Sequence, residues 1–572
     1  MAENGTLLDE MAHWTGVIGR MQQLLMENGA SAALKMVDDT AAILAKSQVD
    51  PKQMVEAQAA WWKEALASWQ SMLPLTPEDA ARIGSDRRFK GALWEEPVFD
   101  VIRQSYVSVA DQLLKGVDAL EGLDPRQKEQ LRFATQSFVE AMSPANFAFT
   151  NPQVLERIFE TRGANLVTGL ERMLADIGAG QIRHVGEDAF AVGKTLATTP
   201  GKVIKETPLY QLIHYAPTTP DVQATPLLIF PPWINRFYIL DLSPEKSFVK
   251  WAVDQGLSVF MVSWKSADMS MASLTMDDYV LRGQLDAIDT VRELLGVPNV
   301  HVVGYCVAGT ALSMLLAWLA ARNEAAKVAS ATFFTAQVDF SEAGDLALFV
   351  DDAQLALIES LAKDGYLDGR YMGATFNLLR GRELIWNYVV SNYLLGNDYP
   401  AFDLLHWNGD TTNLPAKWHQ AYLKDFYKEN RLVTPGGITV GGVPIDLRKV
   451  ATPTYVQAGR EDHIAPARSV WKITHHFAGP LKFVLAGSGH IAGVVNPPEA
   501  QKYQYWTNDT KPASLDDFVA GATEHKGSWW PDWRAWIAAG SEKKVPAKGA
   551  RVPGKGKLKA LEDAPGRYVR AR

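Results

Sequence analysis

The chain has one cysteine in 572 residues, which excludes an intrachain disulfide framework and any metal site built from several thiols. Its first residues, MAENGTLLDEMAHWTG, lack the basic and then apolar order of a signal peptide. The most apolar stretch, residues 306–321, is interrupted by Gly309, Thr310 and Ser313 and ends before Arg322, so it is too short to span a bilayer. These absences predict a reduced, cytoplasmic protein without a transmembrane segment.

The composition is that of a folded protein, with 47% hydrophobic and 21% charged residues. At roughly 100–200 residues per domain, the length predicts two to four structural units. The formal net charge of -8 gives no general attraction to nucleic acid. The charge is uneven, because residues 541–572 hold ten Lys and Arg against three acids, or +7, which leaves -8 - 7 = -15 for the rest. We expect 541–572 to be a basic C-terminal tail, which is most often a solvated extension and less often a docking strip for an acidic surface.

The pattern of apolar residues changes near residue 190. Residues 1–190 repeat apolar side chains at helical spacing and predict an all-helical N-terminal domain, in which Trp61, Trp62 and Trp69 serve core or oligomer packing. Residues 191–540 alternate short β-rich runs with helices, which predicts βαβ units and a mostly parallel sheet. The long helical and aromatic segment at about 341–445 breaks this alternation and is typical of a cap inserted between core strands. The β-rich runs are QLIHYAP, PLLIFPP, LSVFMVSW, NVHVVGYC, VASATFFTA, TPTYVQAG and LKFVLAG.

The single cysteine follows one of these runs and precedes an apolar helix. Strand, tight turn and helix around a nucleophile form an elbow, which needs small residues two before and two after the nucleophile, here Gly304 and Ala308. The N-terminus of the following helix favours the thiolate, the reactive form of cysteine. We therefore predict that Cys306 is a nucleophile rather than a buried core cysteine.

A thiol nucleophile works with a base and an acid that orients the base. Asp462 and His490 each follow a later β-rich run, in the chain order nucleophile, acid, base that an α/β-hydrolase uses. His463 adjoins the acid and is expected to shape the site, and Asp339 is the rival for the acid. In the same fold a backbone N–H of the loop after PLLIF, which we assign to Ile234, would join that of Val307 to hold an oxyanion.

Motifs for other chemistry are incomplete. Val192–Thr195 ends like a phosphate loop, but Asp188 stands where its first glycine would be. The sequence has no His-Glu-x-x-His or Cys-x-x-Cys pair, and no Gly-x-Gly-x-x-Gly follows a strand. Nothing in the sequence therefore predicts a zinc site or a dinucleotide cofactor.

The motifs resemble those of the class I polyhydroxyalkanoate (PHA) synthases, from about residue 75 to the C-terminal region. The resemblance implies an α/β-hydrolase core with a helical cap insertion behind a helical N-terminal domain, and it assigns the catalytic triad to Cys306, Asp462 and His490. One departure is Ala308, where the family usually has glycine. The matching segments are Asp86–Phe89, Ser143–Phe147, Ala197–Lys202, PPWINRFYILDLSPEKS, GYCVAGT, GREDHIAP, GSGHIAGVVNPP and Gly527–Trp530.

The family resemblance implies polymerisation of (R)-3-hydroxyacyl-CoA, typically 3-hydroxybutyryl-CoA, with release of coenzyme A through an acyl-Cys306 intermediate. It implies no metal or bound redox cofactor, a homodimer, and a cytoplasmic location at the surface of polyester granules. Two alternatives stay open: a cysteine-type α/β-hydrolase that acts as a thioesterase, and a non-catalytic scaffold on granule surfaces.

Overall fold

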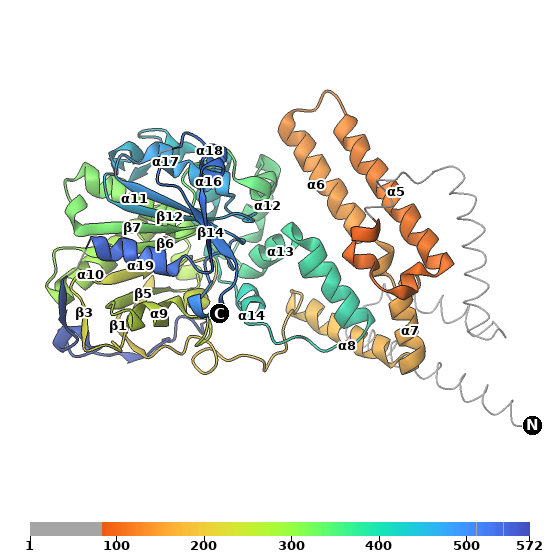
Figure 1. Cartoon of the computed structure of the whole chain (residues 1–572), viewed down its shortest axis with the longest axis horizontal. Coiled ribbons are helices and arrows are strands. Elements are labelled where there is room, and N and C mark those ends of the chain that lie inside the picture. Colours follow the sequence, from red (N-terminus) through yellow and green to blue (C-terminus); the bar gives the residue numbers. More distant parts are fainter. Residues whose placement is uncertain (1–82, 511, 541–542, 572) are drawn as a thin grey trace, which may run out of the picture. The chain divides into compact units, whose positions relative to one another are not determined.

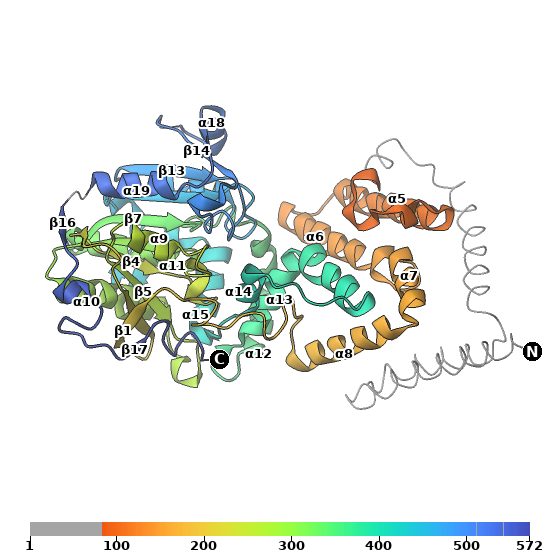
Figure 2. The ribbon, with the colours of Figure 1, turned by 60° about the horizontal axis from the view of Figure 1, so that its bottom comes forward.

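The computed structural model describes residues 83–510, 512–540 and 543–571, and Figure 1 and Figure 2 trace them in two views. The chain divides into two compact units. One runs to Gly186 and includes Ala374–Pro400, and the other consists of Glu187–Gly373 and Ala401–Arg572. The tryptophans predicted to pack near residues 61–69 lie outside the described residues.

The described part of the first unit is helical, as the apolar spacing predicts. Helix α6 begins with a capping box, in which Asp124 and Gln127 each bond to the other's backbone N–H, and Pro125 occupies its first turn. Asn151 caps α7, because its side-chain oxygen accepts backbone N–H groups of the first turn. The helices of this unit before residue 186 are α5 (Pro97–Ala119), α6 (Pro125–Ala141), α7 (Pro152–Thr161) and α8 (Ala164–Ala179).

The long helical and aromatic segment expected at about 341–445 is divided between the two units. Its part Ala374–Pro400 groups with the helical unit and contains η9 (Arg382–Trp386) and η10 (Val389–Leu394). A Cβ atom on Gly169 of α8 would lie 1.7 Å from the carbonyl oxygen of Tyr393, so only glycine allows this packing. Asn165 also donates to the carbonyl of Leu394 at 2.7 Å. These contacts join segments more than 200 residues apart, which helical periodicity alone does not reveal.

The second unit is built on an 11-stranded sheet with the order β15-β14-β13-β12-β7-β6-β4-β5-β2-β1-β17. Its strands from β13 to β5 are parallel, and antiparallel strands extend both sides. Each β-rich run in the sequence overlaps one strand of this sheet, and the strand order agrees with the α/β-hydrolase core that was expected. The predicted strands are β2 (Tyr210–Tyr215), β4 (Leu227–Phe230), β5 (Val259–Trp264), β6 (Val300–Tyr305), β7 (Val328–Phe334), β12 (Thr454–Gly459) and β13 (Leu481–Ala486).

Helices cover both faces of the sheet (Figure 2). One face packs against α10 (Asp286–Leu295), α11 (Val307–Ala321), α16 (Ala467–Trp471) and α17 (Ile473–His476). The other packs against α9 (Phe248–Asp254) and α19 (Trp530–Ala539). The parallel strands are therefore buried on both sides, which explains why their sequences are continuous apolar runs rather than alternating ones.

Several further strands of the second unit match no β-rich run in the sequence, whereas the helices between residues 352 and 428 lie in the segment that was expected to be helical. Among the described residues of the second unit, no helix combines the length and the apolar character needed to cross a membrane, and the same holds for the described part of the first unit. The strands are β1 (Gly201–Glu206), β3 (Asp221–Gln223), β8 (Tyr366–Leu367), β9 (Leu414–Pro415), β10 (Thr439–Val440), β11 (Val443–Pro444), β14 (Gln504–Thr507), β15 (Thr523–Lys526), β16 (Lys544–Pro546) and β17 (Glu562–Asp563). Besides η6 (Asp278–Leu285) and several 3-10 turns, the further helices are α12 (Asp352–Leu361), α13 (Gly369–Leu379), whose residues from Ala374 on belong to the first unit, α14 (Asp403–Gly409), α15 (Ala416–Ala421), η11 (Tyr422–Lys428) and α18 (Leu515–Ala520).

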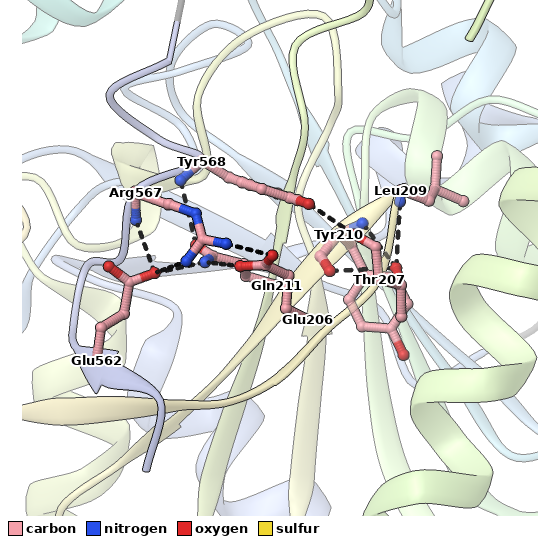
Figure 3. Close-up of polar contacts among 8 residues, drawn as sticks. All are labelled: Glu206, Thr207, Leu209, Tyr210, Gln211, Glu562, Arg567 and Tyr568. Atoms are coloured by element: carbon pink, nitrogen blue, oxygen red, sulfur yellow. Dashed lines mark hydrogen bonds and ion pairs between the residues drawn. The ribbon is translucent and has the colours of Figure 1, made fainter. Parts of the chain in front are cut away.

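The described residues 543–571 of the basic tail dock on the second unit rather than extend into solvent, which agrees with the docking alternative. Strand β16 pairs with β3, and β17 pairs with β1, with Lys202 opposite Asp563. Figure 3 shows how the end of the chain is held: buried Gln211 of β2 donates to Glu562 at 2.5 Å, and Arg567 forms ion pairs with Glu206 and Glu562. The basic residues of the tail therefore meet carboxylates of the sheet edge, which net charge alone does not show.

Candidate active site

Cys306 lies in the sharp turn between β6 and α11. Its backbone has φ 53° and ψ -128°, a conformation that costs energy for a residue with a Cβ atom and that is typical of functional turns. The Cys306 N–H donates to the carbonyl of Phe334 at 2.9 Å, which ties the turn to β7. The side chain is partly exposed, and α11 begins at the next residue, so the sulfur lies at the positive end of a 15-residue helix.

The close packing of this turn rests on two glycines. A Cβ atom on Gly304 would lie 2.6 Å from the Cα atom of Gly309, and one on Gly309 would lie 2.4 Å from the Cβ atom of Ala336. Ala308, by contrast, is fully buried in α11 without disturbing the turn. The departure from the family pattern at Ala308 is therefore accommodated, and the small residue that the turn requires besides Gly304 is Gly309.

Asp462 and His490 form a buried hydrogen-bonded pair. Their strands β12 and β13 are parallel neighbours with Gly459 opposite Ala486, so the loops that follow leave the same edge of the sheet. Asp462 Oδ2 lies 2.7 Å from His490 Nδ1. The other carboxylate oxygen of Asp462 accepts the backbone N–H groups of Ile464 at 2.8 Å and Ala465 at 2.9 Å, which fixes its orientation.

The electrostatics of His490 couple it to both other residues of the predicted triad. Burial lowers its pKa, but the charge of Asp462 and the thiolate of Cys306 together outweigh burial and raise the pKa above its ordinary value. Tyr305, next to the cysteine, donates its hydroxyl to the backbone carbonyl of His490 at 2.9 Å. The structure therefore brings Cys306, His490 and Asp462 together, with His490 between a thiol and a carboxylate.

The rival acid Asp339 has a different partner. Its carboxylate lies 3.3 Å from His476 Nε2 and accepts from Asn430 at 2.9 Å and from Ser341 at 2.6 Å. Burial raises the pKa of Asp339, but these hydrogen bonds outweigh burial and hold the pKa below its ordinary value. His463 is partly buried beside Asp462, where its carbonyl oxygen packs near Gly344. Of the two carboxylates, it is Asp462 that contacts His490.

The two residues named as oxyanion donors lie on loops that leave the same edge of the sheet, because Phe230 and Gly304 pair in parallel register. Val307 is the first residue of α11, a position whose N–H has no partner within the helix. Ile234 follows β4, is packed against the core, and accepts the N–H of Thr412 at 3.2 Å through its carbonyl. That their N–H groups hold an oxyanion stays a prediction.

Sequence reasoning missed two tyrosines of η11. Tyr422 is buried and Tyr427 is partly buried, and burial together with the charge of Cys306 raises the pKa of each phenol. Gln337 donates to the Tyr427 hydroxyl at 3.2 Å, and Tyr422 stacks on Trp418 with 5.1 Å between the ring centroids. A signal for them was available, since they lie in the aromatic insertion, but the sequence does not say which aromatic residues face the thiol.

Within the part of the chain that the structure describes, no group of three or more His, Cys, Asp or Glu side chains is arranged to hold a metal ion. The donor atoms near Cys306 instead form a nucleophile, an imidazole and a carboxylate. Such a set can transfer an acyl group through a covalent intermediate.

Comparison with known proteins gives consistent matches. A family model described as "Poly-beta-hydroxybutyrate polymerase (PhaC) N-terminus" matches residues 85–252, and one described as "alpha/beta hydrolase fold" matches residues 226–497. The poly(3-hydroxyalkanoate) polymerase subunit PhaC of Cupriavidus necator is 42% identical over 99% of this chain and 95% of its own length. The poly(3-hydroxyalkanoate) polymerase of Methylorubrum extorquens is 43% identical over 91% of this chain and 87% of its own.

Similarity to solved structures is weak by comparison. A putative hydrolase from Agrobacterium vitis S4 covers 60% of this chain and 97% of its own, with 13% identity and a TM-score of 0.31. A score this low adds nothing to the assignment, which the sequence relatives carry.

Proposed function

The chain belongs to the poly(3-hydroxyalkanoate) polymerase family and is a polyester-forming acyltransferase, and from that premise we propose how it works. It polymerises (R)-3-hydroxyacyl-CoA, with 3-hydroxybutyryl-CoA as the expected substrate, and releases coenzyme A through an acyl-Cys306 intermediate. The observation that supports this most is the position of Cys306, in a strained turn beside the His490–Asp462 pair.

In the first half-reaction the thiolate of Cys306 attacks the thioester carbonyl of the substrate. His490 receives the thiol proton and returns it to the departing coenzyme A, which leaves as a thiol. The raised pKa of His490 supports an imidazolium beside the thiolate, and the positive end of α11 acts in the same direction. The N–H groups of Val307 and Ile234 would hold the negative charge that develops on the carbonyl oxygen.

In the second half-reaction the 3-hydroxyl of the next unit or of the growing chain attacks the acyl group on Cys306. An alkyl hydroxyl is hardly ionised near neutral pH, so this step needs a base, and His490 takes its proton. Asp462 holds His490 in the tautomer with its proton on Nδ1, which leaves Nε2 free to accept. The new ester bond lengthens the chain by one unit and frees Cys306.

Water would end the chain by hydrolysing the acyl-enzyme, so the site has to exclude it. The burial of Tyr422 and Tyr427 near the thiol supports a cover formed by this part of the insertion. The chemistry needs no metal and no bound redox cofactor, since coenzyme A belongs to the substrate and is the leaving group.

Location and assembly are proposed from the same premise. We expect a homodimer at the surface of polyester granules in the cytoplasm. The helical unit exposes large apolar side chains, among them Phe149 at 71% and Ile177 at 68%, which is more than a monomer in water needs. Such side chains suit either a second copy of the chain or an apolar polymer surface.

Two alternatives remain to be tested against this proposal. A thioesterase would use the same three residues, and a granule scaffold would need none of them. Extended similarity to polymerases over 99% of the chain favours the polymerase over both. The deciding assay incubates purified protein with 3-hydroxybutyryl-CoA and follows thiol release. Insoluble polyester supports the proposal, free 3-hydroxybutyrate indicates a thioesterase, and no thiol release indicates a scaffold.

A further inference from the structure

Residues 407–412 of the insertion form several hydrogen bonds with the loop that follows β4. Thr412 donates its hydroxyl to the carbonyl of Trp233 at 2.5 Å and its N–H to that of Ile234. Trp407 donates its indole N–H to the carbonyl of Arg236 at 2.7 Å. The position of the Ile234 N–H therefore depends on how residues 407–412 lie.

The side chain of Arg236 connects this loop to the end of the chain. It is 2% exposed, its Nε lies 3.4 Å from Asp410, and its Nη1 donates to the backbone carbonyl of Tyr568 at 3.3 Å. Tyr238 donates to the same carboxylate of Asp410 at 2.8 Å. A buried guanidinium thus joins three segments: the loop after β4, the insertion and the C-terminal residues.

The C-terminal residues are in turn fixed to the sheet (Figure 3). The Tyr568 N–H donates to Gln211 Oε1 at 3.1 Å, and its hydroxyl donates to the carbonyl of Thr207 at 2.7 Å. Gln211 is fully buried and its amide nitrogen binds Glu206 at 2.7 Å as well as Glu562. The carbonyl that Arg236 binds is therefore held in place from both ends of the tyrosine.

We propose that Arg236, anchored by Tyr568 and Gln211, positions the backbone of the loop after β4 for binding of the oxyanion. The C-terminal residues thereby act on the reaction through the loop without touching the substrate. This inference rests on the proposed function, because it needs an oxyanion at the loop. It assigns to Arg236 and Gln211 a positioning role that neither the sequence motifs nor the family similarity states.

Two reactions of Cys306 separate positioning from general damage. When the thiolate attacks a thioester, the carbonyl oxygen of the substrate becomes an oxyanion. When the thiolate reacts with iodoacetamide, it displaces iodide and no oxyanion forms. Arg236→Lys keeps the charge but loses the planar fork that spans Tyr568 and Asp410. We expect it to slow acylation about 10²-fold, the usual effect of a misplacement of about 1 Å, with KM and alkylation changed less than about twofold.

Gln211→Asn keeps an amide at the buried position, but its shorter side chain no longer reaches the N–H of Tyr568. We expect a loss of acylation smaller than that of Arg236→Lys, again with little change in alkylation. The double variant should be no slower than Arg236→Lys alone, because both act along one chain of contacts. Lys202→Ala is the matched control: it removes an exposed ion pair to β17 and should leave both reactions unchanged.

The measurements are the acylation rate by rapid quench and mass spectrometry, the alkylation rate, and thermal unfolding. Selective, non-additive loss of acylation supports the positioning role. Equal loss of acylation and alkylation, multiplicative losses in the double variant, or unchanged acylation in Arg236→Lys would each overturn it. If the unaltered protein takes no acyl group from the thioester while it is alkylated normally, the proposed function itself fails, which is a distinct result.

Discussion

Replacing Asp462 with asparagine should separate the two half-reactions. The oxygen that accepts the N–H groups of Ile464 and Ala465 is fixed by those donors, so in the variant it must be the amide oxygen. The amide NH2 then faces His490 Nδ1, where the carboxylate lies at 2.7 Å. The imidazole has to accept at Nδ1 and carry its proton on Nε2, so it no longer takes a proton from the substrate.

The sizes of the two effects differ because the two nucleophiles differ. A base locked in the wrong tautomer costs about 10⁴ in kcat in hydrolase triads, and we expect elongation to fall by that order. A thiol ionises far more readily than an alkyl hydroxyl and needs less help from a base, so acylation should fall much less than elongation. The variant should therefore accept one acyl group on Cys306 and then stall.

The assay is a short pulse of 3-hydroxybutyryl-CoA, followed by mass spectrometry of the peptide that contains Cys306 and by measurement of polyester. His490→Gln should lose both steps, because it removes the base and the cation beside the thiolate. Asp339→Asn is the matched control, since Asp339 pairs with His476, and should leave both steps within about twofold of the unaltered protein. Equal loss of acylation and elongation in Asp462→Asn would refute the reasoning.

Four further outcomes are expected. Cys306→Ala should abolish coenzyme A release while circular dichroism and thermal unfolding stay unchanged, and activity above a few per cent would contradict the covalent mechanism. Gly309→Ala should destabilise the fold by about 1–3 kcal/mol through its clash, whereas Ala308→Gly should cost only about 1 kcal/mol of helix stability and keep activity; urea unfolding compares them. Burial raises the pKa of Asp241, so ionisation of this group lowers the stability of the folded protein as the pH rises above about 4. Asp241→Asn should therefore be more stable to urea than the unaltered protein at pH 7. This gain should vanish below about pH 4, where Asp241 is protonated in both the folded and the unfolded state. Sedimentation should show a dimer that substrate promotes, and only monomer at micromolar concentration would contradict it.

Much of the second unit could be predicted because parallel strands leave a strong local signal. Strands buried on both faces are continuous apolar runs, and residues such as Asp462 and His490 follow them at the edge where such loops meet. The role of Cys306 as a nucleophile could be predicted because a tight turn of this kind leaves no room for a side chain two residues earlier, where Gly304 stands. Local sequence therefore determines this part of the site.

The rest depends on pairings that local sequence does not encode. Strands β1, β14 and β15 are partly exposed, so they show no continuous apolar run. Residues 374–400 join the helical unit through contacts such as that of Gly169 with Tyr393, which no periodicity shows. The charge of the tail left two readings open, a solvated extension or docking on an acidic surface, because a net charge of +7 does not reveal the carboxylates of Glu206 and Glu562.

During synthesis of the protein, strand β1 is made long before β17, the strand that pairs with it. Arg567 lies 361 residues after its partner Glu206, and at about 5–20 residues per second the ribosome needs roughly 20–70 s to make that length. Throughout that interval the outer edge of β1 has no strand beside it, and an open edge is a site at which nascent chains pair with one another. Pairing of β17 covers this edge, and the residues that follow it supply the carbonyl of Tyr568 to Arg236.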